Sequence, residues 1–187
     1  MAELITGYGV EREELLEYVE ENVTQYLTFL IATKTFAVGI LDVNEIIEVS
    51  EMTDVPMMPD FIRGVINLRG NVVPVIDLAA RMGRGQSELS KRSCIVLVEI
   101  NKQDGGSQPI GMLVDAVNEI VEIEQSHIQP APNMGDGINT DFIQAMGRVN
   151  DLFIILLDID HVLSTEQIGQ LENIAQAPEA LSSLFEA

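Results

Sequence analysis

The residues that could act as metal ligands or general bases are few. The chain has two histidines, His127 and His161. His161 follows Asp158 and Asp160, and these three side chains could ligate a metal. No cysteine or second histidine joins them at a ligand spacing, so we predict no metal site and no cofactor. A hydrolase or metal enzyme built on the three residues stays an alternative, which elemental analysis of the purified protein would test.

Motifs for covalent or phosphoryl chemistry are absent from the sequence. No G-x-S-x-G nucleophile elbow and no G-x-x-x-x-G-K phosphate loop occurs. The single cysteine, Cys94, lies in the apolar run CIVLV, which favours a small buried side chain over a reactive thiol. Asp77 and Asp158 each follow an apolar strand, and we expect them to cap the helices that come next. We therefore predict a protein without catalytic activity.

Arg69 is a cation beside Gly70, at a turn between two apolar stretches of a very acidic chain. One interpretation is a solvated turn arginine. The other is an anchor that projects into a protein interface, where arginine is enriched. The residues alone do not decide between them.

The charge balance excludes several classes of partner. The 187 residues include 30 acids and 10 bases, a formal net charge of −20. Nucleic acids and anionic membrane surfaces both require a basic footprint that this chain lacks. No apolar stretch reaches the ~18 residues of a spanning helix, and the N-terminus lacks a basic region before an apolar one. We predict a cytoplasmic protein with no direct membrane insertion.

Short strands dominate the expected elements. Residues 11–23 have apolar side chains four apart and predict a short amphipathic helix packed on the domain surface, with a partner-binding helix as the minority interpretation. Residues 43–49 are ambiguous between helix and strand. Pro74 predicts an edge strand or a bulge. Strands separated by tight turns are expected over 26–31, 35–40, 64–68, 72–78, 94–100, 110–123 and 142–157, and short helices near 158–163 and from Ser164.

Two pairs of segments recur in the same order. Residues 43–49 read VNEIIEV and residues 117–123 read VNEIVEI, an offset of 117 − 43 = 74. A second pair of matches joins residues 65–67 to 148–150, at an offset of 150 − 67 = 83, and residues 75–78 to 156–159, at an offset of 158 − 77 = 81. Repeated order indicates duplication. We expect two similar β units of about five short strands each, shaped as small barrels, with a groove between them.

The stretch from Phe61 to Leu78, FIRGVINLRGNVVPVIDL, resembles the CheW family, the coupling proteins of bacterial chemotaxis. The family hallmark is G-V-I-N-L-R-G followed by V-x-P-V-I-D-L, and both motifs are present. Further stretches match in the same order over about residues 24–166: 25–29, 43–47, 55–59, 111–122, 138–140 and 149–163.

The resemblance implies a mainly β fold with a few short helices, in which two SH3-like five-stranded barrels lie side by side. It implies a non-catalytic adaptor between the cytoplasmic tips of methyl-accepting chemoreceptors and the regulatory domain of a histidine kinase. Arg69 matches a family position implicated in this coupling. Val43, Glu45 and Ile46 match positions near the receptor groove, and Asn67, Leu68 and Gly70 are expected to hold the turn that presents Arg69.

Some features depart from the family pattern. Residues 79–82, AARM, replace the commoner R-x-R-F, and residues 101–108 carry extra polar side chains. We divide the chain into an N-terminal extension over 1–23 with a short acidic amphipathic helix, a CheW-like domain over 24–166 made of two repeated β subdomains, and a C-terminal helix and tail over 167–187. An alternative pathway for the same fold is a chemosensory-like system that controls type IV pilus motility or another kinase output.

Overall fold

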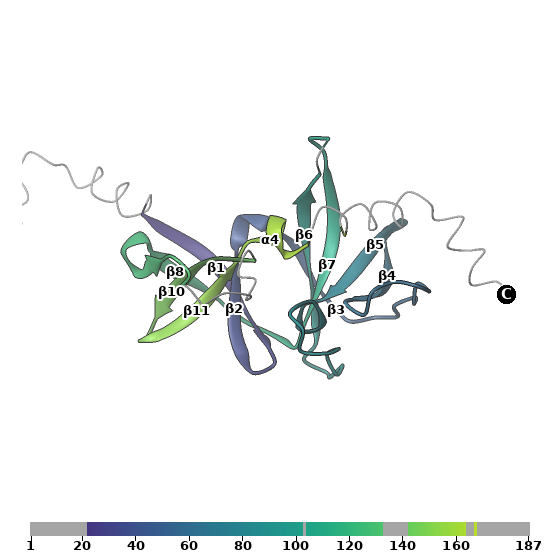
Figure 1. Cartoon of the computed structure of the whole chain (residues 1–187), viewed down its shortest axis with the longest axis horizontal. Coiled ribbons are helices and arrows are strands. Elements are labelled where there is room, and N and C mark those ends of the chain that lie inside the picture. The colour runs from purple at the N-terminus through teal and green to yellow at the C-terminus, as the bar shows by residue number, and fades with distance from the viewer. Residues whose placement is uncertain (1–21, 103, 133–141, 164–166, 168–187) are drawn as a thin grey trace, which may run out of the picture.

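The fold consists of two β barrels that lie side by side (Figure 1). The computed structural model describes residues 22–102, 104–132, 142–163 and 167. Barrel A contains six strands in the order β8-β1-β2-β11-β10-β9: β1 (Val23–Ile31), β2 (Lys34–Gly39), β8 (Ala116–Glu124), β9 (Ile128–Gln129), β10 (Ile143–Val149) and β11 (Leu152–Leu157). Barrel B contains five in the order β3-β6-β7-β5-β4: β3 (Val43–Glu48), β4 (Ile62–Leu68), β5 (Asn71–Asp77), β6 (Cys94–Asn101) and β7 (Ser107–Val114).

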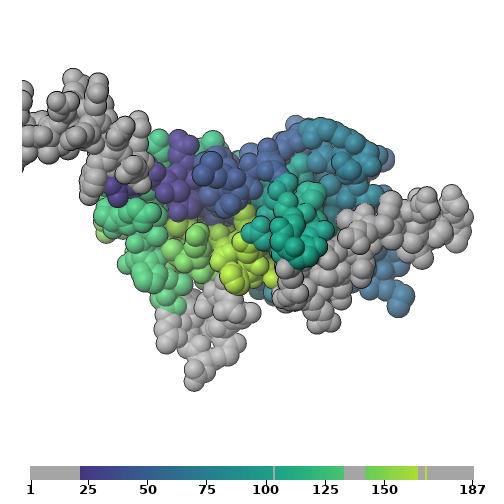
Figure 2. Space-filling view, turned by 90° about the horizontal axis from the view of Figure 1, so that it is seen from above, coloured from purple at the N-terminus to yellow at the C-terminus, as the bar shows by residue number. Residues whose placement is uncertain are grey.

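Helices in the described residues are short. They are η1 (Ile40–Asp42), α3 (Leu78–Arg81), η2 (Gln125–His127) and α4 (Ile159–Val162). Viewed from above, the molecule has two lobes, and the yellow segment near residue 160 lies between them (Figure 2). The prediction of a mainly β fold with two small barrels is therefore confirmed, with the two-residue strand β9 as an addition to barrel A.

The two barrels exchange strands between the sequence repeats. Barrel A takes β1 and β2 from the first half of the chain, with β8, β10 and β11 from the second. Barrel B takes β3, β4 and β5 from the first half, with β6 and β7 from the second. The two strand orders match position by position, β8 with β3, β1 with β6, β2 with β7, β11 with β5 and β10 with β4. The two barrels thus share one strand order, and each contains strands from both sequence repeats.

Each barrel has one parallel contact, at the junction between strands of different repeats. β2 pairs with β11 through Phe36 and Ala37, and β7 pairs with β5 through Gly111 to Leu113. All other described pairings are antiparallel. The parallel contact is the point at which β strands far apart in the chain meet.

The shared core fills the space between the sheets. Its buried side chains come from both barrels, for example Phe29 and Val38 of barrel A with Val96 and Met112 of barrel B. Val162 of α4 also belongs to this cluster, so the small helix seals the junction. Two smaller clusters fill the barrels themselves. The groove expected between the halves is therefore occupied at depth by packed apolar side chains.

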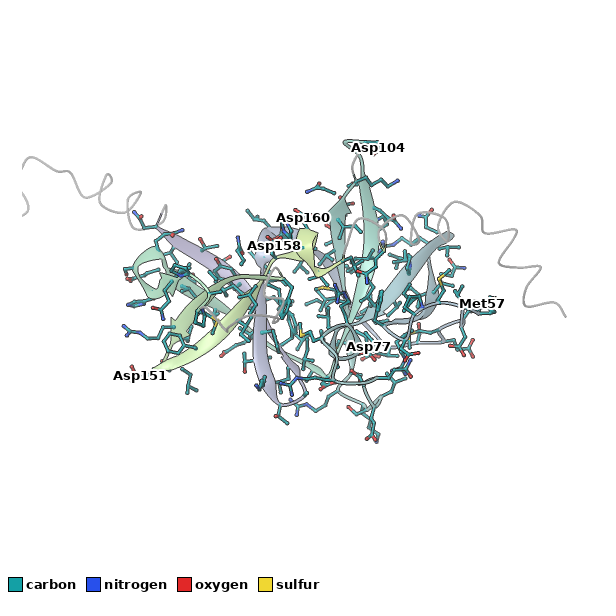
Figure 3. All side chains as sticks on the ribbon, viewed as in Figure 1. Met57, Asp77, Asp104, Asp151, Asp158 and Asp160 are labelled. Atoms are coloured by element: carbon teal, nitrogen blue, oxygen red, sulfur yellow. The ribbon has the colours of Figure 1, made fainter. Side chains whose placement is uncertain are left out.

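Asp77 and Asp158 both cap helices, as the sequence predicts. Asp77 Oδ1 accepts a hydrogen bond from the Ala80 N–H at 3.3 Å, and Asp158 Oδ1 accepts one from the Asp160 N–H at 3.1 Å. Asp77 is fully buried, and its charge is balanced by Arg63 at 3.0 Å. Figure 3 shows Asp77 in the lower part of barrel B and Asp158 between the two barrels.

Two local expectations change. Residues 43–48, ambiguous in the sequence, form strand β3 because β6 supplies a pairing partner from Cys94 to Val98. Pro74 lies in an interior strand rather than at an edge, since β5 pairs with β4 on one side and with β7 from Val75 onward on the other. The helix expected over 11–23 lies almost wholly outside the described residues, as does the helix expected from Ser164. No helix in the described part of the chain is long and apolar enough to cross a membrane.

Gly64 closes barrel B. Its φ is +147°, and a Cβ there would lie 2.4 Å from the Thr53 carbonyl oxygen. Thr53 and Val65 form an isolated bridge with hydrogen bonds of 2.8 and 2.9 Å, which joins the segment after β3 to β4. Only glycine permits this approach between the two edges of the sheet.

We predict that Gly64→Ala lowers the free energy of unfolding by about 3 kcal/mol, since a strained φ and a backbone clash add. Urea unfolding followed by circular dichroism measures the change. Gly106→Ala is the matched control, because its Cβ would meet only flexible side-chain atoms. Equal stability of both variants would show that the bridge does not close the barrel.

Candidate protein-interaction site

The turn between β4 and β5 presents Arg69 at the end of barrel B. Leu68 pairs with Asn71, so Arg69 and Gly70 alone form the loop. Their φ values are +51° and +86°, the pattern of a type I′ turn. The Asn67 side-chain oxygen accepts a hydrogen bond from the Gly70 N–H at 2.8 Å. This hydrogen bond joins Asn67 and Gly70 across the turn.

Arg69 occupies a backbone conformation that arginine seldom adopts. The left-handed region costs a non-glycine residue roughly 1–2 kcal/mol, and asparagine or glycine is the usual occupant of this turn position. At the equivalent turn of barrel A the residue is Asn150, with the same φ of +51°. An arginine at a position that favours asparagine indicates a role for its side chain.

Arg69 forms an ion pair with Glu45 of β3. Its Nη2 lies 2.9 Å from Oε1 and 2.8 Å from Oε2 of the carboxylate. The arginine side chain is 70% exposed and the glutamate 36%, so the pair stabilises the fold by only about 0–1 kcal/mol. β3 and β4 are the two end strands of barrel B, and the pair therefore links opposite edges of the sheet.

The other predicted site residues divide into exposed and packed groups. Ile46 is exposed beside Glu45 on β3. Val43 packs against the core shared by the barrels, and Leu68 packs against the interior of barrel B. A partner can contact Arg69, Glu45 and Ile46. The side chains of Val43 and Leu68 instead pack against the apolar clusters. We call the first three the Arg69 surface.

A bulge helps to orient this surface. The register of β3 against β6 shifts between Val43 and Glu45, so Asn44 is the extra residue. β8 has the equivalent irregularity against β1, between the partners of Leu27 and Phe29. There the Thr28 hydroxyl donates to the Glu119 carbonyl at 2.8 Å and lies 3.2 Å from the Glu119 N–H. Bulges re-aim side chains, and both copies place a glutamate after the bulge.

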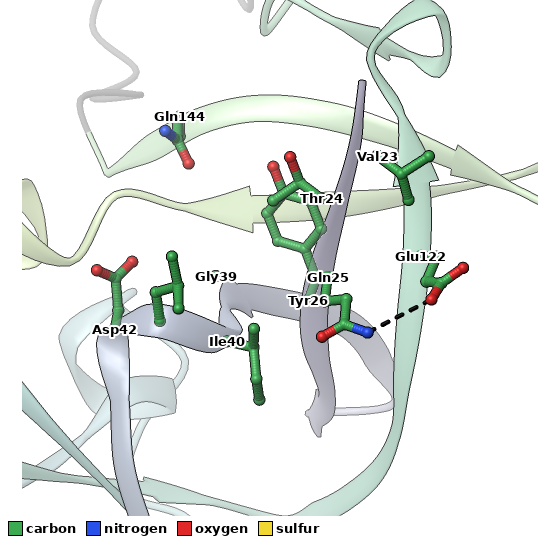
Figure 4. Close-up of a pocket in the computed structure, with 10 residues that line it drawn as sticks. Val23, Thr24, Gln25, Tyr26, Gly39, Ile40, Asp42, Glu122 and Gln144 are labelled. Atoms are coloured by element: carbon green, nitrogen blue, oxygen red, sulfur yellow. Dashed lines mark hydrogen bonds between the residues drawn. The ribbon is translucent and has the colours of Figure 1, made fainter. Parts of the chain in front are cut away.

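A cavity of about 740 Å³ lies at one mouth of barrel A. β1, η1, β8 and β10 surround it, and its polar groups include Asp42, Tyr26 and Gln144 (Figure 4). Gln25 Nε2 donates to Glu122 at 3.4 Å. Leu41 at the rim is 96% exposed. The lining holds no nucleophile with an adjacent general base, which covalent catalysis requires.

Acidic side chains gather where η1 meets α4. Burial raises the pKa of Asp42, and the charges of Asp160 and Asp158 raise it further. Burial also raises the pKa of Tyr26, whereas a hydrogen bond with Thr24 lowers it. His161 Nδ1 lies 2.7 Å from Asp158 Oδ2, and Asp160 accepts hydrogen bonds from Asn101. The three residues considered as metal ligands thus contact protein groups, and no cluster of three ligands occurs within the ranges given above.

Fold and site together define a class of protein, a two-barrel β scaffold that offers exposed side chains at its ends. A family model described as the CheW-like domain matches residues 25–167. The chain belongs to this family.

Named relatives agree with this membership. The chain is 31% identical to a chemotaxis protein CheW of Rhizobium meliloti over 76% of this chain and 89% of that protein. It is 28% identical to a chemotaxis protein CheW of Klebsiella aerogenes over 82% and 89% of the respective chains. The crystal structure of the scaffolding protein TtCheW from Thermoanaerobacter tengcongensis has a TM-score of 0.68 and 34% identity, and the match covers 78% of this chain and 92% of that one.

Several surface features of the structure were not predicted from the sequence. The repeat does not reveal that Glu45 pairs with Arg69, because the two residues lie on end strands joined only by barrel closure. Leu41, Leu152 and Phe153 appear as ordinary apolar residues of strands, yet all three are exposed. The sequence repeat pairs Asn150 with Asn67, whereas the register of the two hairpins makes Asn150 the counterpart of Arg69, at an offset of 150 − 69 = 81.

We predict that Arg69→Asn changes the free energy of unfolding by less than about 1 kcal/mol. The loss of an exposed ion pair is offset by relief of the left-handed backbone. Urea denaturation provides the measurement, with Glu45→Gln as the companion that removes only the ion pair. A loss above about 2 kcal/mol for either variant would mean that the pair holds the barrel closed.

We predict that Asp42→Asn stabilises the protein at pH 7. A raised pKa in the folded state means that the ionised carboxylate opposes folding once the pH exceeds the folded value. Below the ordinary pKa of 3.8 the carboxyl is protonated in both the folded and the unfolded state, and it no longer opposes folding. The difference in free energy of unfolding between the variant and the parent must therefore vanish as the pH falls from the folded pKa to below 3.8. Urea midpoints from pH 3 to 7 measure it, with exposed Asp60→Asn as the control. A pH-independent difference would exclude the electrostatic cause.

Proposed function

We propose that the chain is a non-catalytic adaptor in bacterial chemotaxis, which couples the cytoplasmic tips of chemoreceptors to a histidine kinase. Membership of the CheW-like family and the names of the relatives support this function. All the named relatives above are chemotaxis or scaffolding proteins, so the alternative of a pathway for pilus motility is not favoured. The adaptor acts in the cytoplasm, where the receptor tips and the kinase are found.

The receptor tip docks on the Arg69 surface. The observation that carries this assignment is the exposed arginine held in a turn that favours asparagine. Only Nη2 of its guanidinium donates a described hydrogen bond, which leaves further N–H groups for a carboxylate or carbonyl of the partner. Ile46 is exposed on the other face of β3 from Glu45 and extends the surface that a partner can cover.

The Arg69–Glu45 pair can be exchanged during docking. A partner carboxylate that binds Arg69 competes with Glu45, and a partner cation then binds the released Glu45. Because the pair itself contributes little to stability, the exchange costs little. The fold remains closed through the Thr53–Val65 bridge and the barrel interior.

The kinase binds the chain through the regulatory domain of the kinase. The family resemblance implies that this domain is similar in fold to the present chain. An adaptor that binds both partners at once needs two separate surfaces. The two-barrel architecture supplies two ends, as Met57 and Asp151 at opposite ends of the molecule illustrate (Figure 3).

We predict that Arg69→Glu weakens binding to a receptor cytoplasmic fragment of the same genome at least tenfold. Charge reversal places two carboxylates together and removes the donor to the partner. Biolayer interferometry measures the affinity. Lys91→Glu, the same change of charge at an exposed residue before β6, at the other end of the sheet, is the control.

Two results would overturn the assignment. One is equal affinity of Arg69→Glu and the unchanged protein for the receptor fragment. The other is binding of neither the receptor fragment nor the kinase regulatory domain by the unchanged protein, which would remove the adaptor function as a whole.

A further inference from the structure

One methionine differs from the others of the described ranges in its exposure to solvent. Met57 is 102% exposed, whereas Met112 is fully buried in the core that the barrels share. Met58, the next residue in the sequence, packs against the same core. A single peptide bond therefore separates an open thioether from a shielded one. The remaining described methionines are all partly buried, namely Met52, Met82 and Met146.

A tight turn between β3 and β4 places Met57 in solvent. Pro56 occupies the first inner position of this turn, and Met57, with a φ of +61°, occupies the second. This is the pattern of a type II turn, whose second inner position favours glycine or asparagine. The left-handed backbone is costly for methionine, and the exposed side chain gains no burial in return. Packing in the core therefore does not explain this methionine.

Both sides of the turn are fixed to the fold. Thr53 pairs with Val65 of β4 in the isolated bridge described above. Val55 and Met58, which flank the turn, pack against the shared core. Figure 3 shows Met57 at the outer end of barrel B. The thioether of Met57 thus stays accessible while the fold is intact.

An exposed thioether is open to oxidation by peroxides. The sulfur attacks one oxygen of hydrogen peroxide, the O–O bond breaks and an S–O bond forms. A proton moves from the transferred oxygen to the departing one, so the products are methionine sulfoxide and water. The sulfur loses two electrons and the peroxide gains them, so no further reactant is needed. Water around the sulfur stabilises the charges that separate as the O–O bond breaks, which an apolar core does not do.

The charge of the protein selects among oxidants. The chain has a formal net charge of −20, and the exposed carboxylates of Asp54 and Asp60 lie on either side of the turn in the sequence. Anionic oxidants are repelled by this field. Hydrogen peroxide is neutral at pH 7 and approaches without this penalty. A neutral hydroperoxide is therefore the class of oxidant that fits Met57.

The polar product is compatible with the fold at Met57 but not in the core. A sulfoxide at Met112 would place a polar oxygen among apolar side chains without a hydrogen-bond partner. At Met57 water solvates the oxygen. Oxidation then changes one surface side chain from apolar to polar and leaves the barrels intact. The exposure that admits the peroxide also admits a reductase that restores the thioether.

We infer that Met57 is a reversible oxidation site. It takes a neutral hydroperoxide as its oxidant, and the class of reaction that consumes its product is methionine sulfoxide reduction. The inference does not depend on the adaptor function, since it rests on the exposure, the turn and the charge of this chain alone.

Peroxide treatment followed by peptide mass spectrometry tests the site. The whole protein reacts with excess hydrogen peroxide at pH 7, catalase stops the reaction at intervals, and trypsin releases residues 35–63 as one peptide. Fragment ions locate each added oxygen. We expect the sulfoxide of Met57 to form at least about tenfold faster than that of Met58 or Met112. In concentrated urea the three rates should agree within about twofold, which assigns the difference to the fold.

Two variants and a reductase complete the test. Met57→Leu should remove the fast oxidation of the peptide 35–63, whereas Met52→Leu, the same change at a partly buried methionine of that peptide, should retain it. Protein oxidised at Met57 alone should keep the urea midpoint of its parent. Methionine sulfoxide reductases with dithiothreitol should restore the original mass, and both types are required because each reduces one sulfoxide epimer.

The inference fails on any of three results. Oxidation rates of Met57 and Met58 that agree within about twofold in the folded protein would show that exposure does not govern the reaction. Retention of the fast oxidation in Met57→Leu would place it at another residue of the peptide. A lowered urea midpoint after oxidation of Met57, or a sulfoxide that the reductases do not reduce, would exclude a reversible modification of the folded protein.

Discussion

The two barrels depend on one apolar core that they share. Side chains such as Phe29 from barrel A and Met112 from barrel B are fully buried in the same cluster, and α4 covers it through Val162. Neither barrel can leave the other without exposing this cluster to water, which would cost about 25 cal/mol for each Å² of apolar surface. The relative positions of the two ends, and hence of the surfaces on them, are fixed by this packing rather than by a linker.

Duplication followed by divergence explains how one fold offers two different ends. The strand orders, the bulges after Val43 and Val117 and the two-residue turns are retained in both copies. The copies differ by the added strand β9 and by side chains at the tips, where Arg69 corresponds to Asn150 and Val72 to Phe153. Such changes cost the fold little because these side chains are exposed, while they alter what each end can bind.

The sequence predicts the strands, the tight turns and the duplication because these rest on local chemistry. The sequence predicts turns at residues 69–71 and 150–151, the first of which the structure narrows to Arg69 and Gly70, and it predicts caps at Asp77 and Asp158. It does not predict that the repeats exchange strands, since no local pattern decides whether β3 pairs within its own repeat or with β6. For the same reason the ion pair between Arg69 and Glu45 was not expected, although both residues were assigned to the site. The individual roles of the seven predicted site residues stay predictions.

The exchange of strands also makes the two barrels unequal during synthesis. Barrel B is built from one uninterrupted segment, β3 to β7, so all its strands are available once residue 114 has left the ribosome. In barrel A, β1 and β2 can pair with each other early, but the outer edges of this hairpin stay unpaired until β8 and β11 follow, and the parallel contact joins residues more than a hundred positions apart. Because a growing chain emerges from its N-terminus, the barrel that bears Arg69 is complete first. It then provides the template on which β1 and β2 meet β8 and β11.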